Sequence, residues 1–246
     1  MNGYPEIIER HRTPQNERNY RILLEVFLST LTPKNHFVFH LTLLHIIIFM
    51  TDKKNGKKNA GGFQNMGLSE EVYRGIVKMG FRVPTPVQRK SLPVILSGTD
   101  TVVMARTGSG KTAAFCIPLL ERLLNSQRRK QQQSASVNFS AGAVILSPTR
   151  ELSLQTLKVL QTLSQFIEEP RLKCIGINGG ESMEKQFALL SSNPDVIVAT
   201  PGRLAHHLSE IPDFHLKHCD LMVFDEADRL FEMGTFHSFF FHARDY

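Results

Sequence analysis

The sequence contains few cysteines, and their spacing does not fit a metal site. Cys116, Cys174 and Cys219 lie far apart, form no Cys-x-x-Cys pair and have no histidine at the spacing of a zinc ligand. An odd number of separated thiols is typical of a reduced intracellular protein. Cys116 and Cys174 stand in apolar periodic segments, so we expect small buried side chains there rather than reactive thiols.

The sequence also lacks a hydrophobic run of the usual length for a membrane span. Its uncharged stretch over residues 35–51 is densest over residues 41–50 and includes His36, His40 and His45. A membrane helix needs about 20 largely apolar residues, and this stretch is shorter. The stretch also begins far from the N-terminus and has no small-residue cleavage site, which argues against a secretory signal.

Residues 1–60 differ in composition from the rest of the chain. They mix polar segments with the uncharged stretch and end in a lysine-rich linker at residues 53–58. We interpret residues 1–60 as an atypical extension that is disordered or non-native. A variant tethered to a membrane through residues 36–50 is the alternative, and cell fractionation would distinguish the two.

Beyond that extension, the sequence has little excess of positive over negative charge. The whole chain has a net charge of +6, but residues 1–60 hold nine Lys and Arg against five Asp and Glu. The remaining residues are therefore close to balanced. A nucleic-acid site there has to be a local arrangement of Arg, Lys and backbone NH groups, because no general basic field exists.

An alternation of short apolar segments with amphipathic ones fills the region after residue 60. At 246 residues and 41% hydrophobic content, the chain fits one large α/β domain. Ser69 as a helix cap and Pro86 in a first turn predict two early helices, and a third follows residue 110. The helices are expected at residues 69–79, 85–96 and 111–124, and the strands at 101–105, 143–147, 172–177, 195–199 and 221–224. This order predicts a parallel sheet with helices on both faces. The polar residues 127–136 indicate a mobile surface insertion.

A glycine-bearing loop joins the expected strand 101–105 to the helix that begins at Lys111. Residues 105–112 read Ala-Arg-Thr-Gly-Ser-Gly-Lys-Thr and fit a phosphate-binding loop, except that Ala105 replaces its first glycine. Gly108 and Gly110 let the backbone turn its NH groups toward a phosphate, and the helix adds its positive end. Lys111 would reach the β and γ phosphates, and Thr112 would bind Mg²⁺. The expected phosphate-site residues are Ala105, Arg106, Thr107, Gly108, Ser109, Gly110, Lys111 and Thr112.

Two adjacent carboxylates end the expected strand 221–224. Asp225 is placed to hold Mg²⁺ through water, and Glu226 to orient and activate the water that attacks the γ phosphate. Acidic residues at strand ends are common on protein surfaces, so alone they indicate little. With the phosphate loop they predict a nucleotide site, because both strand ends lie on the carboxyl edge of the sheet, where α/β proteins bind ligands. Lys111, Asp225 and Glu226 are the expected catalytic residues.

Residues 225–228 read Asp-Glu-Ala-Asp, and the sequence resembles the DEAD-box RNA helicases. Residues 80–88 are similar to the Q motif of that family, and Phe63 precedes Gly80 by the 17 residues typical of it. The resemblance implies that the amide of Gln88 contacts the hydrogen-bonding edge of adenine, with Phe81 and Phe63 as aromatic residues of the base site. An amide can make a two-point contact to adenine, and an aromatic ring can cover its face.

Three further segments resemble family motifs that hold single-stranded RNA. Each pairs a strand end with a helix N-terminus and so presents NH groups, a hydroxyl or an arginine to a phosphate. The residues expected to bind the RNA backbone are Pro148, Thr149, Arg150, Gly179, Gly180, Thr200, Pro201, Gly202 and Arg203. Taken singly, each segment also fits turn chemistry and helix capping, and Arg150 with Glu151 could form a network within the domain.

The resemblance covers residues 61–234 and implies the first RecA-like, P-loop domain of a helicase that uses ATP and Mg²⁺. Residues 61–69 and 228–234 are most similar to a nucleolar branch that acts in large-subunit ribosome assembly. That branch implies a nuclear, nucleolar location and pre-ribosomal protein partners. Residues 235–246 read as a divergent tail.

After Gly234 the sequence departs from the family, which continues with a Ser-Ala-Thr strand and a second RecA-like domain. We therefore expect an incomplete domain that binds ATP and RNA weakly and is inactive alone. An enzyme of another P-loop class is one alternative. Another is a non-enzymatic product that competes for RNA or partners of the full helicase, which salt-dependent RNA binding without turnover would favour.

Overall fold

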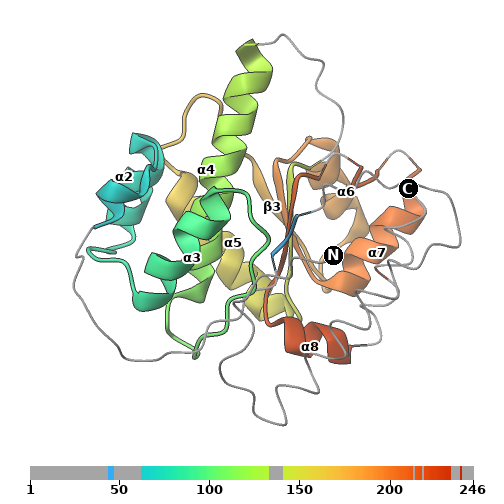
Figure 1. The fold of residues 1–246 in the computed structure, drawn as a ribbon. Coiled ribbons are helices and arrows are strands. Elements are labelled where there is room, and N and C mark those ends of the chain that lie inside the picture. Colours follow the sequence, from blue (N-terminus) through green and yellow to red (C-terminus); the bar gives the residue numbers. More distant parts are fainter. Residues whose placement is uncertain are drawn as a thin grey trace, which may run out of the picture. The chain divides into compact units, whose positions relative to one another are not determined.

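Five parallel strands form the central sheet, in the order β1-β5-β2-β4-β3 (Figure 1). The computed structural model describes residues 44–46, 62–132, 141–212, 214–217, 219–233 and 239, all within the unit that spans residues 42–246. The strands are β1 (Leu44–Ile46), β2 (Ala143–Leu146), β3 (Cys174–Ile177), β4 (Val196–Ala199) and β5 (Leu221–Phe224). The expected parallel α/β sheet is confirmed.

Helices connect the strands, because parallel neighbours require a crossover rather than a tight turn. The helical elements are η2 (Phe63–Met66), α2 (Glu70–Lys78), α3 (Pro86–Leu96), α4 (Lys111–Gln132), α5 (Arg150–Ser164), α6 (Met183–Ser191), α7 (Pro201–Glu210) and α8 (Ala227–Glu232). Figure 1 shows α2, α3 and α4 on one side of the sheet and α6 and α7 on the other. Both faces are therefore covered, as the sequence predicts.

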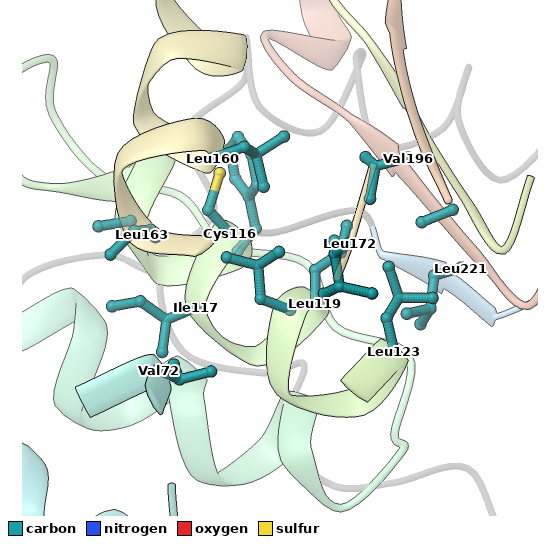
Figure 2. Packing of buried hydrophobic residues seen from close by; sticks show 14 of the residues in the cluster. Val72, Cys116, Ile117, Leu119, Leu123, Leu160, Leu163, Leu172, Val196 and Leu221 are labelled. Atoms are coloured by element: carbon teal, nitrogen blue, oxygen red, sulfur yellow. The ribbon is translucent and has the colours of Figure 1, made fainter. Parts of the chain in front are cut away.

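The strand residues alternate between two core clusters, one on each face of the sheet. Ala143 and Ile145 of β2 join the cluster formed with α2, α3, α4 and α5, whereas Val144 and Leu146 join the cluster formed with α6, α7 and α8. Figure 2 shows the first cluster, in which Cys116 of α4 lies beside Leu160 of α5. Because β2 is buried on both faces, its sequence is a continuous apolar run rather than an alternating one.

The three cysteines are free thiols, as expected. Cys116 and Cys219 are buried and Cys174 is half-buried. Burial raises the pKa of Cys174 and of Cys219 to about 12, and it raises the pKa of Cys116 as well. A thiol with so high a pKa carries little thiolate, so these side chains act as small core residues.

The start of α2 differs from the predicted cap. The hydroxyl of Ser69 makes no capping hydrogen bond to the helix; it donates to the carboxylate of Glu121 at 2.8 Å, and the Ser69 amide donates to the same oxygen at 2.9 Å. Glu121 lies on α4, so its carboxylate holds Ser69, the residue before α2, from a neighbouring helix. The Ser69 hydroxyl is thus engaged by a residue 52 positions away in the sequence instead of capping its own helix.

Residues 101–105 do not form the strand that their apolar sequence predicts. They have no regular secondary structure, although Thr101 and Val103 are buried. A strand requires a hydrogen-bonded neighbour, and β5 pairs with β2 on one side and with β1 on the other. The described edge of β5 is therefore taken by Leu44–Ile46, and residues 101–105 pair with no described strand.

Helix α4 is longer than predicted. It runs to Gln132 and so includes residues 127–132, which the sequence analysis placed in a mobile insertion. Arg, Lys and Gln are good helix formers, and Arg128 also pairs with Glu71 on α2. Residues 133–136 of the expected insertion lie outside the described residues.

Most of the expected extension also lies outside the described residues. Its residues 44–46 form β1 and pair in register with Leu221, Met222 and Val223 of β5. Among the residues that the structure describes, no helix is long and apolar enough to cross a membrane. The expected tail, residues 235–246, is described only at Phe239, which is buried in the cluster with α7 and α8.

The contact between α2 and α5 depends on a glycine. A Cβ at Gly75 would lie 2.0 Å from the Leu163 carbonyl oxygen, so the two helices could not keep their distance. We expect Gly75→Ala to lower the free energy of unfolding by about 3 kcal/mol, measured by urea denaturation. Gly62→Ala is the control, because nothing lies within 4 Å of a Cβ there. Equal effects of the two changes would contradict this account of the packing.

Candidate functional site

The loop before α4 turns sharply at two glycines. Gly108 has φ +77° and Gly110 has φ +91°, values that side-chain-bearing residues rarely adopt. Between them the Ser109 amide closes a turn onto the Arg106 carbonyl at 3.2 Å. α4 begins at Lys111, directly after the turn, so the free NH groups and positive end of the helix follow the loop.

The loop contains polar groups that a phosphate would satisfy. The hydroxyl oxygen of Ser109 is buried and has no hydrogen-bond partner among the described residues. The ammonium of Lys111 donates to the carbonyl of Ala105, at the start of the same loop. Buried polar atoms normally have partners, and an anionic oxygen is a stronger acceptor than a carbonyl. The residues present therefore fit a nucleotide phosphate.

Gln88 connects the Q-motif segment to the phosphate loop. Its side chain is 2% exposed; its Nε2 donates to the Gly110 carbonyl at 3.1 Å, and its Oε1 accepts from the Thr85 amide at 2.9 Å. The second contact belongs to a capping box that starts α3. An adenine contact by Gln88 remains a prediction, and it would use the same amide atoms in exchange for these partners.

The two aromatic residues of the expected base site differ in exposure. Phe63 is 1% exposed and belongs to the core cluster with α2 and α4. Phe81 is half-buried and packs against the edge of that cluster. Phe81 can therefore offer a ring face to a ligand, whereas Phe63 contributes through packing.

The acidic pair begins where β5 ends. The Asp225 amide donates to the Leu146 carbonyl at 2.9 Å, which continues the pairing of β5 with β2 beyond the strand. Burial and the neighbouring Glu226 raise the pKa of Asp225 to about 6, while the charge of Lys111 acts in the opposite direction. A shared site for the lysine and the aspartate remains a prediction. A cation at this position would favour the ionised form of Asp225.

Glu226 adopts an uncommon backbone conformation. Its φ and ψ are +50° and +53°, in the left-handed region that disfavours side-chain-bearing residues. Its carboxylate accepts from Arg229 at 2.8 Å, one turn along α8. A strained residue at a strand end is typical of functional sites. This left-handed conformation turns the chain from β5 into α8 at Glu226, the residue directly after Asp225.

The three segments expected to bind RNA lie together at the carboxyl ends of their strands. The Arg150 guanidinium donates to the Gly179 carbonyl at 3.0 Å and lies 3.6 Å from the Glu181 carboxylate. Arg203 donates to the Glu181 carbonyl at 3.2 Å from the other side. The turn at residues 179–181 is therefore held between an arginine of α5 and an arginine of α7. We call this turn, with residues 200–203, the α7 rim.

A cavity of about 380 Å³ opens at the α7 rim. Its lining residues are Gly179, Thr200, Pro201, Gly202, Arg203, His206 and Met233. The Thr200 side chain makes no capping hydrogen bond to α7, whereas the Thr149 hydroxyl accepts from the Leu152 amide at 3.3 Å and caps α5. Pro148 and Pro201 are buried, although Pro201 also lines the cavity, and RNA contacts by these two residues remain a prediction. Sequence reasoning did not place His206 or Met233 at the site, although Met233 lies in residues 228–234, because neither side chain belongs to a phosphate-binding pattern.

A larger cavity, of about 880 Å³, lies away from these residues. It is lined by the end of α3, the second half of α4 and the start of β5, including Gly98, Arg122 and Leu221. Ligands of parallel α/β sheets bind at the carboxyl ends of the strands, whereas this cavity lies where β5 begins. We therefore place the candidate site at the loop, the acidic pair and the α7 rim.

Within the described part of the chain, no group of three or more His, Cys, Asp or Glu could hold a metal ion by itself. Mg²⁺ commonly binds to one or two protein oxygens together with phosphates and water. Thr112, directly after Lys111, and Asp225, directly after β5, offer a hydroxyl and a carboxylate oxygen and so fit that mode. Their role as Mg²⁺ ligands remains a prediction.

Comparison with protein families matches residues 85–243 to the DEAD/DEAH box helicases. The chain belongs to the DEAD/DEAH box helicase family. DEAD-box ATP-dependent RNA helicase 29 of Oryza sativa subsp. indica is 53% identical over 178 residues, which are 72% of this chain and 20% of that protein. ATP-dependent RNA helicase DDX54 of Mus musculus is 54% identical over 178 residues, 72% of this chain and 19% of that protein. The chain thus spans about a fifth of the length of these curated relatives.

A solved helicase structure supports the same family fold. The crystal structure of a DEAD box protein from the hyperthermophile Methanococcus jannaschii aligns with a TM-score of 0.59 and 32% identity. The alignment covers 74% of this chain and 46% of that chain. The RecA-like, P-loop type of domain expected from the motifs is confirmed.

The strain at Glu226 predicts a gain in stability on substitution. Glycine adopts φ +50° without steric cost, so we expect Glu226→Gly to raise the free energy of unfolding by about 1 kcal/mol, even though the Arg229 contact is lost. Asn193→Gly is the control, because Asn193 has φ +53° but asparagine tolerates that region and the gain should be smaller. Urea denaturation measures both. A loss of stability in Glu226→Gly would show that the residue is not strained.

A buried histidine on α7 predicts a pH dependence of stability. Burial, with the nearby charges of Arg203 and His206, lowers the pKa of His207 from 6.5 to about 4. In the unfolded chain this histidine takes up a proton as the pH falls through 6.5, whereas in the folded chain it stays neutral down to about pH 4. The free energy of unfolding therefore loses nothing from this group above pH 6.5 and decreases as the pH drops toward 4. We expect wild type to lose about 2 to 3 kcal/mol more than His207→Gln between pH 7 and 4.5. Denaturation at both pH values measures the difference, and parallel losses would contradict the low pKa.

Proposed function

We propose that this chain provides the ATP site and part of the RNA site of an ATP-dependent RNA helicase. The observation that carries the proposal is the position of Lys111 at the start of α4, directly after the glycine turn, and of Asp225 directly after β5, a strand of the parallel sheet. A loop with positive φ at Gly108 and Gly110 precedes the lysine, and the strained Glu226 follows the aspartate. A phosphate-binding loop opposite two carboxylates is the arrangement that phosphoryl transfer from a nucleotide requires.

Each residue of the ATP site has a role in the proposal. The amides of residues 108–111 and the Lys111 ammonium bind the phosphates, and Thr112 and Asp225 hold Mg²⁺ directly or through water. The metal, when bound, neutralises charge on the phosphates. Glu226 accepts a hydrogen bond from the attacking water and orients it. Gln88 and Phe81 hold the base, and the amide of Gln88 selects adenine through its amino group and a neighbouring ring nitrogen.

The α7 rim is proposed to bind the backbone of single-stranded RNA. Arg150, Gly180, Thr200 and Arg203 offer charged and backbone donors that phosphates and sugars accept, without contacts to base edges. Thr200 and Arg203 line one cavity, and Arg150 contacts the turn beside it through the Gly179 carbonyl, which supports this role. Binding of this type does not depend on sequence and weakens with salt.

We place the helicase in ribosome biogenesis, with pre-ribosomal proteins as partners and a nucleolar location. The support is the resemblance of residues 61–69 and 228–234 to the nucleolar branch, together with relatives named DDX54 and dbp10 at 54% and 50% identity. The RNA substrate itself is not selected by any base contact in this proposal.

The ATP site is tested by a single lysine substitution. We expect Lys111→Ala to weaken binding of Mg-ATP about 10- to 100-fold, because a charge-assisted hydrogen bond to phosphate is lost. Isothermal titration calorimetry measures the affinity. Lys158→Ala is the matched control, since Lys158 is exposed on α5 and should leave ATP affinity unchanged. Equal affinity of Lys111→Ala and wild type would refute the proposed site.

A further inference from the structure

A buried chain of hydrogen bonds lies behind the α7 rim and is not part of any motif singled out in the sequence. Asn178 ends the β3 segment, Gln186 lies on α6 and His207 lies on α7; they are 1%, 0% and 0% exposed. Gln186 donates from Nε2 to the Asn178 carbonyl, and its Oε1 lies 2.8 Å from His207 Nε2. Three elements are thus joined through one glutamine side chain.

The chain of bonds fixes the tautomer of His207. The Gln186 Nε2 donates to a carbonyl, which is only an acceptor, so the Oε1 of the same amide must face His207. Because Oε1 only accepts, His207 Nε2 must carry the proton. Nδ1 then carries no proton, and it has no hydrogen-bond partner among the described residues. The neutral ring with the proton on Nε2 is the form that completes the chain.

The same three elements carry the α7 rim. Asn178 directly precedes Gly179 and Gly180, and Arg203 lies one turn before His207 on α7. Arg203 also contacts the turn through the Glu181 carbonyl and the Met183 sulfur. Gly180 leaves little room, because a Cβ there would lie 2.3 Å from the Arg150 guanidinium. The turn therefore sits between two arginines, and its base is tied to α7 through Gln186.

We propose that His207 and Gln186 are positioning residues for RNA: their buried hydrogen bond fixes the turn at residues 179–181 relative to the start of α7. This proposal rests on the proposed function, because it assigns to the α7 rim a geometry that RNA phosphates require. Two rim segments from different elements must present their donors at a set spacing to contact one backbone. Without the bond, α6 and α7 keep their apolar packing but lose the directional contact between them.

The test compares two changes at one position. His207→Phe keeps a ring and removes the donor, whereas His207→Gln can place an amide donor toward Gln186. We expect His207→Phe to weaken binding of a fluorescent single-stranded oligouridine on the order of tenfold, and His207→Gln to restore affinity to near wild type. Mg-ATP affinity, measured on the same samples, should not change, since the phosphate loop lies on other elements.

A matched control separates positioning from a general loss of stability. Ile76→Val removes one methylene from a fully buried side chain of α2, on the other face of the sheet, and should leave RNA affinity unchanged. RNA affinity of folded His207→Phe equal to wild type would overturn the proposal. A loss of ATP affinity that parallels the loss of RNA affinity would also overturn it, because the effect would then be a general one.

Two measurements without RNA keep this proposal separate from the proposed function. If wild type binds no RNA, the proposed RNA role of the rim has failed, and positioning is read from hydrogen exchange instead. The amides of Gly180 and Glu181 should exchange at least tenfold faster in His207→Phe than in wild type; equal rates contradict positioning.

If His207→Phe does not fold, the ¹⁵N chemical shifts of the imidazole in wild type at pH 7 test the hydrogen bond itself: we expect a neutral His207 with its proton on Nε2. A proton on Nδ1 would contradict the hydrogen bond itself.

Discussion

The candidate site depends on the placement of one positively charged lysine and two negatively charged carboxylates at the carboxyl edge of a parallel sheet. Lys111 stands at the first position of α4, and Asp225 and Glu226 follow β5 directly. Each charge is costly at a half-buried position by itself, which is why burial and Glu226 raise the pKa of Asp225 to about 6. A nucleotide with its metal would bring opposite charge to both sides. The protein thus holds the carboxylates of Asp225 and Glu226 near one another, and the metal of a bound nucleotide would reduce the repulsion between them.

The sheet brings these groups together because all of its pairings are parallel. Every described strand ends at the same edge, so the loops after β2, β3, β4 and β5 meet there. Cores on both faces hold the strands in register, and helices that start at that edge direct their NH groups toward it. The proposed ATP site and the α7 rim are therefore neighbours by topology. The hydrogen bond between His207 and Gln186 adds a direct contact between two of the helices on one face.

Much of the fold and site could be predicted, because the signals were local. Strand β5 matches its apolar run residue for residue, and α4 begins at Lys111, directly after the phosphate loop, as expected. The failures came from contacts distant in sequence. Residues 101–105 have the sequence of a strand but no described partner strand, because β1 pairs with β5. The Ser69 hydroxyl donates to Glu121 and does not cap its own helix. The ion pair between Arg128 and Glu71 supports an α4 that is longer than expected. Gln186 and His207 gave no signal, since a polar residue on a helix is normally exposed.

The central claim is that one nucleotide and its metal lie between the phosphate loop and the acidic pair. The most direct measurement is paramagnetic line broadening in the ¹⁵N-labelled chain, with Mn²⁺ and a non-hydrolysable ATP analogue in place of Mg²⁺ and ATP. The account predicts that the amides of residues 108–112 and of residues 225–226 broaden together, while those of α2 stay sharp. Broadening of the loop without residues 225–226, or of neither, would contradict it.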